Sequence, residues 1–308
     1  LGPMLADALQ ALAFNLSFAI PRLDGAVDPG TGQPVVVDLF LESDFLSTTF
    51  TQSSGGRLAL RARSYPGERG VPAGEPFDSN LGTPGRVACG QGTQTLVIPG
   101  VAPMEVVLAD DTLNEILHAA WWGGLLEFPL PPSMLGGVDL GQYGITDLEL
   151  FVSAWLPPVA SDCGPTGNLV MHVADLKITA SLKLFGQPMD VLIFGAFEAG
   201  VEVGAADGAI SITILSIDNF EMEVNILQEN LIASEGVIRD LIMAQLVPSL
   251  EGMLGGGEPL ASFPLPEIDL SDSVGLPPGT AVIRIGVQNG AGWEGRIDGN
   301  TIIYGALQ

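Results

Sequence analysis

Long segments in which apolar and polar residues alternate constrain this chain more than any other feature. From Met189 to Val203 one register is wholly apolar, while the other carries charged residues such as Glu198 beside a few apolar ones. Similar alternation extends over 174–184 and 210–226. It places apolar side chains on one face of a β-strand, and ordinary strands have only about five or six residues. We therefore expect long antiparallel strands that curl, so that their apolar face encloses a tube, either packed with side chains or holding an apolar ligand.

Composition sets the surroundings in which such a tube would work. The 308 residues can bury one large core or two linked ones, and 36 Asp and Glu against 11 Lys and Arg give a net charge of -25. This surface excludes nucleic acid and strongly anionic membranes as general partners. A hydrophobic content of 47% and a mean hydropathy of +0.39 exclude an acidic disordered chain. The charge must therefore lie outside a well-filled, turn-rich structure.

The two cysteines bear on the compartment. Cys89 and Cys163 both lie in loop-like sequence, and we expect a disulfide between them, the alternative being two free thiols. No run of eighteen apolar residues predicts a transmembrane helix. The chain starts at Leu1 without a charged signal region, which we interpret as loss of an export signal. We expect a periplasmic, outer-membrane-associated or secreted protein.

Three segments have helical spacing of apolar residues: Met4–Ala19, a segment from Asp110 to about Phe128, and about Leu231–Leu254. In the second, Thr112 and Glu115 form a capping-box pattern, and prolines 129, 131 and 132 are expected to end the helix. Strands are expected over 34–42, 47–52, 57–63, 145–156, 171–185, 188–203, 208–227, 281–288 and 293–304, with a Gly/Pro-rich linker over 66–100.

The order of several short motifs resembles a known family. The motifs are Asp111-Thr112-Leu113-Asn114, Gly124-Leu125-Leu126, the four-strand block, and the late Leu-rich helix that runs into Glu258-Pro259-Leu260 and Phe263-Pro264-Leu265-Pro266. In that order they resemble the second barrel of the bactericidal/permeability-increasing protein (BPI) family, within the tubular lipid-binding (TULIP) superfamily. The resemblance covers about 101–308, and residues 1–100 look like the last helix of a preceding barrel, strands of a central sheet and a linker.

The resemblance implies an α+β fold, in which a long, strongly curved antiparallel sheet wraps around long helices and the gap between them binds acyl chains. Endotoxin-neutralising members of the family are strongly cationic at one tip, and this chain is not. The implied function is therefore lipid holding and not lipopolysaccharide neutralisation. Ten residues are predicted to line the cavity: Leu113, Leu117, Trp121, Val191, Ile193, Phe197, Ile212, Ile214, Ile238 and Ile242. The alternative is that they form a filled core facing helices.

Other candidate sites have simpler explanations. Trp121-Trp122 could form an aromatic gate to the ligand, or Trp121 could be core and Trp122 could pack under a loop. The alternating Arg57, Arg61 and Arg63 could meet lipid headgroups or an acidic partner, or pair with nearby carboxylates. We expect no metal site, because the Cys and His spacings match no zinc motif. The acidic loops at 24–28 and 269–272 could bind calcium or be solvated loops, and neither has the spacing of a known calcium loop.

An enzyme is not expected. The sequence has no Gly-x-Ser-x-Gly elbow, no phosphate-binding glycine loop and no cluster of histidine and carboxylate that would serve a hydrolase. A structure that shows a serine within hydrogen-bond reach of His118 or His172 could overturn this expectation. We expect an exported lipid-binding or lipid-transfer protein without a cofactor, which holds a neutral or zwitterionic lipid, a sterol or a similar molecule and contacts membranes transiently. The main alternative is a structural or adhesive surface protein whose tube is filled.

Overall fold

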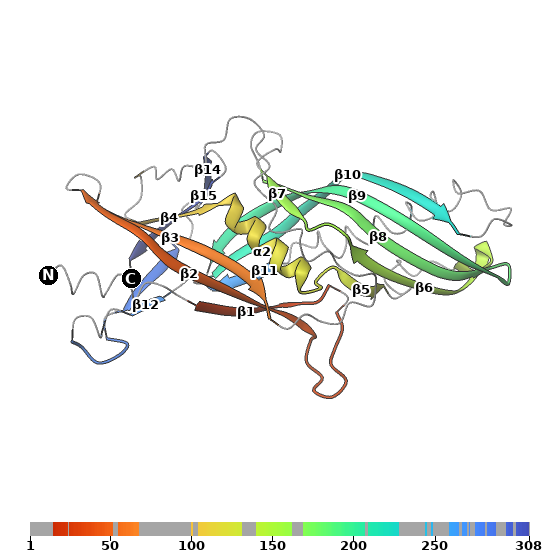
Figure 1. Ribbon diagram of the computed structural model, residues 1–308, viewed down its shortest axis with the longest axis horizontal. Helices are drawn as coiled ribbons and strands as arrows, with labels where there is room; N and C mark the ends of the chain where they lie inside the picture. The colour runs from red at the N-terminus through yellow and green to blue at the C-terminus, as the bar shows by residue number, and fades with distance from the viewer. Residues whose placement is uncertain are drawn as a thin grey trace.

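Antiparallel sheets dominate the computed structural model of the chain (Figure 1). It describes residues 15–23, 25–51, 55–67, 100, 104–130, 140–161, 169–206, 209–227, 244, 248, 259–264, 267–269, 271, 275–280, 282–287, 294–297 and 300–307. In these residues three sheets lie along an elongated molecule, and one helix with defined ends, α2 (Asp110–Trp122), lies near its middle.

The largest sheet has the strand order β11-β10-β9-β8-β6-β5, with β7 paired to β8, and contains the four predicted long strands as β6, β8, β9 and β10. Its strands are β5 (Glu127–Leu130), β6 (Ile145–Ala154), β7 (Val159–Ser161), β8 (Val170–Leu184), β9 (Gln187–Ala206), β10 (Ala209–Ile226) and β11 (Pro259–Pro264). Through β9 every second residue from Met189 to Val203 is buried, and those between are more exposed. The predicted two-faced pattern therefore holds along β9. In β10 it holds for Ile210, Ile212 and Ile214, and beyond the register shifts only Val224 of the predicted face is buried.

Bulges curve this sheet. Pairing shifts register near Asp147 in β6, Asp175 in β8 and Asn219 in β10, and each of these residues has a positive φ, of 52°, 49° and 50°. Asp and Asn adopt this conformation more readily than other residues with a side chain, and a bulge increases strand twist. The long strands β8, β9 and β10 accordingly bend along their length (Figure 1).

Two smaller sheets complete the described structure. One is β1 (Asn15–Pro21), β2 (Val36–Thr51) and β3 (Gly55–Pro66), in that order. The other is β12 (Glu267–Asp269), β13 (Val282–Val287), β15 (Asn300–Leu307) and β14 (Glu294–Ile297), with β4 (Met104–Ala109) paired to β15. The two strands expected over 34–42 and 47–52 are one continuous strand, and the strand expected over 293–304 is two.

The expected α+β class, with a sheet wrapped around long helices, is wrong. The described chain is mostly β-sheet, and α2 has 13 residues. It ends at Gly123, before the prolines, because Gly124 has a φ of 87° and the amide of Leu125 bonds back to the Ala120 carbonyl. Phe128, expected on the helix, lies in β5. The expected capping box is also absent, since the N-cap is Ala109 and no side chain caps it.

The other two predicted helices fare differently. Residues 15–19 of the expected Met4–Ala19 helix lie in β1, where Phe18 and Ile20 are buried and the residues between them exposed, which is a strand period. Residues 4–14 lie outside the described residues. So does most of the segment 231–254, of which Ala244 and Pro248 are described and are helical.

Two buried side chains tie α2 to the large sheet. The Asn114 amide donates to the Ala160 carbonyl at 3.0 Å and accepts from the Ala160 N–H at 2.6 Å, so it serves β7 as a neighbouring strand would. About two helical turns later, the Trp121 indole N–H donates to the Ala154 carbonyl of β6 at 2.7 Å. Because β2 and β3 pack against the same helix, α2 connects the small sheet to the large one.

Candidate functional site

A cavity lies between α2 and the buried face of the large sheet. Empty space of about 660 Å³ adjoins its lining side chains, and this figure includes open solvent outside the cavity. Helix α2 and the turn after it supply one wall, and strands β5, β6, β8, β9 and β10 supply most of the other. The lining side chains are all apolar: Leu23, Leu117, Ala120, Trp121, Leu125, Leu126, Phe128, Val152, Pro158, Met171, Val173, Leu176, Phe197 and Ile214.

The structure divides the predicted lining residues into three groups. Leu117, Trp121, Phe197 and Ile214 line the cavity. Leu113, Val191, Ile193 and Ile212 are buried in the surrounding core, away from its wall. Ile238 and Ile242 lie outside the described residues. Helical and strand periodicity therefore identified the buried faces, while the position of the cavity along those faces depends on how the helix crosses the sheet.

Sequence reasoning missed several lining residues on β8 because of one bulge. A continuous two-residue period would place Ala174 with Leu176 and Ile178 on the buried face. In the structure Met171 and Val173 are buried, the register shifts at Asp175, and Leu176 then continues the same face. Asp175 was the available signal, since Asp within an apolar strand can adopt the positive φ of a bulge.

Trp121 and Trp122 differ in environment. Trp121 is fully buried, and its indole N–H is satisfied by Ala154 while the residue lines the cavity. Trp122 is half-buried and meets Trp121 edge-on, with ring centroids 6.1 Å apart. Trp122 also stacks with His118 at a centroid distance of 6.1 Å. Trp121 is thus a wall of the cavity and part of the core.

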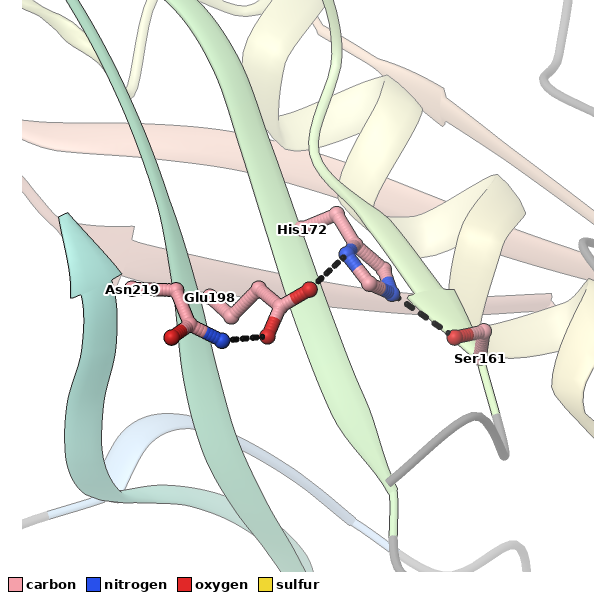
Figure 2. Close-up of polar contacts among 4 residues, drawn as sticks. All are labelled: Ser161, His172, Glu198 and Asn219. Atoms are coloured by element: carbon pink, nitrogen blue, oxygen red, sulfur yellow. Dashed lines mark hydrogen bonds and ion pairs between the residues drawn. The ribbon is translucent and has the colours of Figure 1, made fainter. Parts of the chain in front are cut away.

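A second candidate is a row of polar side chains across four neighbouring strands (Figure 2). Ser161 Oγ lies 2.9 Å from His172 Nε2, and His172 Nδ1 lies 3.5 Å from Glu198 Oε1. The Asn219 amide donates to Glu198 Oε2 at 2.5 Å. His172 alternates with Met171 and Val173, both of which line the cavity, so the row lies on the opposite face of the sheet.

This row contains the groups used in nucleophilic catalysis: a serine, a histidine and a carboxylate. It meets the criterion set above for reconsidering an enzyme. Its geometry is nevertheless unlike a nucleophile elbow, which presents the serine on a sharp turn. Ser161 is fully buried in the strand β7, and the histidine–glutamate contact is long for a hydrogen bond.

The arginine candidates lie beside carboxylates on the small sheet. In the β2–β3 pair, Arg61 lies opposite Asp44 and Arg63 opposite Glu42. Arg63 also forms an exposed ion pair with Asp44, with 3.9 Å between Nη2 and Oδ2. The strand pairing of Arg57 is with Thr49. Arg63 therefore pairs with a carboxylate and Arg61 lies opposite one, as the alternative interpretation expects, whereas the strand partner of Arg57 is not a carboxylate.

Neither metal-ligand clusters nor membrane-spanning helices occur in the described residues. They contain no group of three or more His, Cys, Asp or Glu side chains that could hold a metal ion. In the first acidic loop, Asp28 accepts a hydrogen bond from the Gly30 amide at 2.7 Å, which lowers the pKa of its carboxyl. Cys89 and Cys163 lie outside the described part. No helix among the described residues is long and apolar enough to cross a membrane.

Comparisons with known proteins complete the picture. No family model matches the sequence, and no curated protein matches it. The chain is similar to a solved structure titled "Crystal structure of lipopolysaccharide binding protein" at 12% identity and a TM-score of 0.30, over 100% of this chain and 95% of that one. At that TM-score the likeness decides neither fold nor function, which rest on the chain's own geometry.

Proposed function

We propose that this protein binds a lipid by enclosing its acyl chain in the cavity between α2 and the large sheet. The observation that carries the proposal is a cavity between α2 and the large sheet whose wall is wholly apolar. Protein interiors are normally packed to crystal-like density, so an apolar cavity between helix and sheet is unusual in a core that serves only stability. Small-molecule sites are commonly concave and have mostly apolar linings.

Binding of an acyl chain in this cavity requires no polar contact between protein and lipid. Burial of an acyl chain is worth about 0.8 kcal/mol per methylene, so a chain of several methylenes binds through its length alone. The headgroup would stay at the open side. Because the chain carries a net charge of -25, neutral or zwitterionic lipids, sterols and similar molecules fit it better than strongly anionic ones. We place this function outside the cytoplasm, in the periplasm, at the outer membrane or in a secreted form.

The structural or adhesive alternative requires a filled tube. It predicts that side chains occupy the space between helix and sheet, and the cavity beside Trp121 and Phe197 favours the lipid-binding proposal instead. The decisive test is organic extraction and native mass spectrometry of the purified protein, followed by reloading of delipidated protein with phosphatidylcholine. We expect co-purifying or reloaded lipid at about one molecule per chain. Neither co-purifying lipid nor uptake would refute lipid binding.

We also propose that the chain acts without catalysis and that the row from Ser161 to Asn219 is a structural link between strands. The buried Ser161 and its position on the face opposite the cavity support this. A fluorophosphonate probe, which labels activated serines, should leave the native protein unlabelled. Labelling that disappears in Ser161→Ala would instead establish the hydrolase alternative.

A further inference from the structure

The turn between the two long strands β8 and β9 carries an unusual residue. These strands end at one extremity of the long axis of the molecule (Figure 1). The connection consists of Phe185 and Gly186, with φ values of 49° and 77°. Phe185 is 78% exposed, more than any other large apolar side chain in the described residues.

The hairpin itself does not explain this phenylalanine. A two-residue turn with positive φ at both positions favours Asn-Gly or Asp-Gly, because Asn and Asp tolerate that conformation. A bulky side chain at positive φ is strained, and exposure of the ring to water forfeits its hydrophobic gain. The three other positive-φ residues with side chains are Asp147, Asp175 and Asn219, as expected from these preferences. Phe185 therefore has two costs that a function would explain.

A second aromatic residue lies beside the turn. The Phe185 amide donates to the Gly144 carbonyl at 2.7 Å, and its ring covers Gly144 so closely that a Cβ there would lie 2.3 Å from the ring. Tyr143 precedes this glycine at the end of the short 3-10 helix η2 (Leu140–Tyr143) and is 46% exposed. We call Tyr143, Gly144, Phe185 and Gly186 the aromatic tip.

The aromatic tip is electrically neutral in a strongly acidic protein. In residues 140–147 and 182–189 the charged side chains are Asp147 and Lys183. They form an ion pair, with 2.7 Å between Lys183 Nζ and Asp147 Oδ2. The rest of the chain carries the net charge of -25, which opposes contact with anionic lipid. Asp139 and Asp190 follow directly outside these ranges, so the tip is an uncharged point on an acidic surface, which a neutral bilayer can approach without electrostatic repulsion.

We propose that the aromatic tip docks on neutral, zwitterionic phospholipid surfaces, with the Phe185 and Tyr143 rings inserted at the headgroup level. Aromatic side chains prefer this interface because their rings are apolar while the Tyr hydroxyl keeps a polar contact. The end-on position lets the long hairpin meet a membrane while the acidic sides of the molecule stay in water. Docking at the tip is independent of whether the cavity holds lipid.

The test is Phe185→Asn, which restores the preferred turn residue while it removes the ring. We expect the melting temperature to stay unchanged or rise, and co-flotation with phosphatidylcholine vesicles to weaken about tenfold or more. Tyr143→Ser should weaken it further. Leu215→Asn is the matched control, because Leu215 is 58% exposed on β10 outside the tip and its loss should leave co-flotation unchanged.

Three results would overturn the proposal. The first is a Phe185→Asn variant that co-floats as well as the wild type. The second is a Leu215→Asn variant that loses as much co-flotation as Phe185→Asn. The third is stronger binding of the wild-type protein to vesicles that contain phosphatidylserine than to vesicles of phosphatidylcholine. The cavity is tested separately by extraction of bound lipid. A protein that carries lipid and does not bind vesicles would refute docking and keep the proposed function. A protein that binds vesicles and carries no lipid would keep docking and refute the proposed function.

Discussion

Glu115 shows at the scale of one residue how the fold reassigns a side chain. Its place in a Thr-x-x-Glu pattern predicted a helix cap. In the structure Glu115 Oε2 accepts a hydrogen bond from the Ser64 amide of β3 at 3.3 Å. Helix α2 begins directly after β4, so its first turn is fixed by the sheet and not by a side-chain cap. The residue pattern was visible in the sequence, but the partner was 51 positions away.

The environment of Glu115 gives a pH-dependent prediction. Burial raises the pKa of its carboxyl above the ordinary value of 4.5, while the Ser64 amide and Arg63 oppose the shift. The folded state therefore binds this proton more tightly than the unfolded state. The stabilisation by this group is complete below about pH 4.5 and is lost as the pH rises through the folded pKa. Glu115→Gln should increase the free energy of unfolding at pH 7 relative to wild type and change it little at pH 4.

Urea denaturation at the two pH values measures this difference. Glu202→Gln, at an exposed position of β9, serves as the control and should change little at either pH. A variant Glu115→Gln that is less stable than wild type at pH 7 would show that the carboxylate is stabilising there and would contradict the argument from burial.

At the scale of elements, the Asn114 amide is the clearest link between helix and sheet. It is fully buried and makes both hydrogen bonds to the Ala160 backbone. Asn114→Ala would leave a buried N–H and a buried carbonyl without this partner, at a cost of about 1–3 kcal/mol for each. We expect the free energy of unfolding to fall by about 2–4 kcal/mol. Asn225→Ala, which removes an exposed hydrogen bond to Glu223, should cost far less. Equal stability of the two variants would contradict the proposed link.

The long strands could be predicted from the sequence, and the reason is physical. A period of two persists through β9 because one face of the strand is buried along its whole length. Every second residue is therefore apolar, and the pattern is visible in the sequence. Residues 15–19 were misassigned because the helical spacing of leucines 5, 9, 12 and 16 was extended into a segment where Leu16, Phe18 and Ile20 alternate as a strand. Bulges are harder to predict, because a single Asp175 changes the phase of all that follows.

At the scale of the whole molecule, the arrangement of helix and sheet could not be predicted from periodicity. Periodicity placed Leu113 and Leu117 on one buried helix face, and both are buried. Only Leu117 reaches the cavity, because the wall is set by where α2 crosses β8, β9 and β10. The expected α+β fold class was wrong for a related reason. Local patterns identify single helices and strands, whereas the fold class depends on the proportion of helix and strand over all segments.

One prediction concerns a long-range covalent link. Cys89 and Cys163 lie outside the described residues, and we expect them to be joined, because paired loop cysteines in an exported protein are usually oxidised. On the chain-entropy model a loop of this length stabilises the fold by about 4 kcal/mol. Thiol labelling under denaturing, non-reducing conditions should find no free cysteine. Labelling of both would contradict the link and weaken the case for export.

The claim that the space beside α2 is a lipid cavity is tested most directly by two tryptophan substitutions one helical turn apart. Leu117 lines the cavity, whereas Leu113 is fully buried away from it. Leu113→Trp should overpack the core by about 1–3 kcal/mol and lower the melting temperature. Leu117→Trp should be accommodated in the empty space and occupy the volume that an acyl chain needs.

The measurement is uptake of a fluorescent fatty-acyl phosphatidylcholine by delipidated protein, normalised to the folded fraction and paired with the melting temperature of each variant. We predict that Leu117→Trp loses about tenfold or more of its lipid affinity, the equivalent of about 1.4 kcal/mol, with little change in melting temperature. A Leu117→Trp protein that melts as early as Leu113→Trp, yet takes up lipid like wild type, would contradict the cavity.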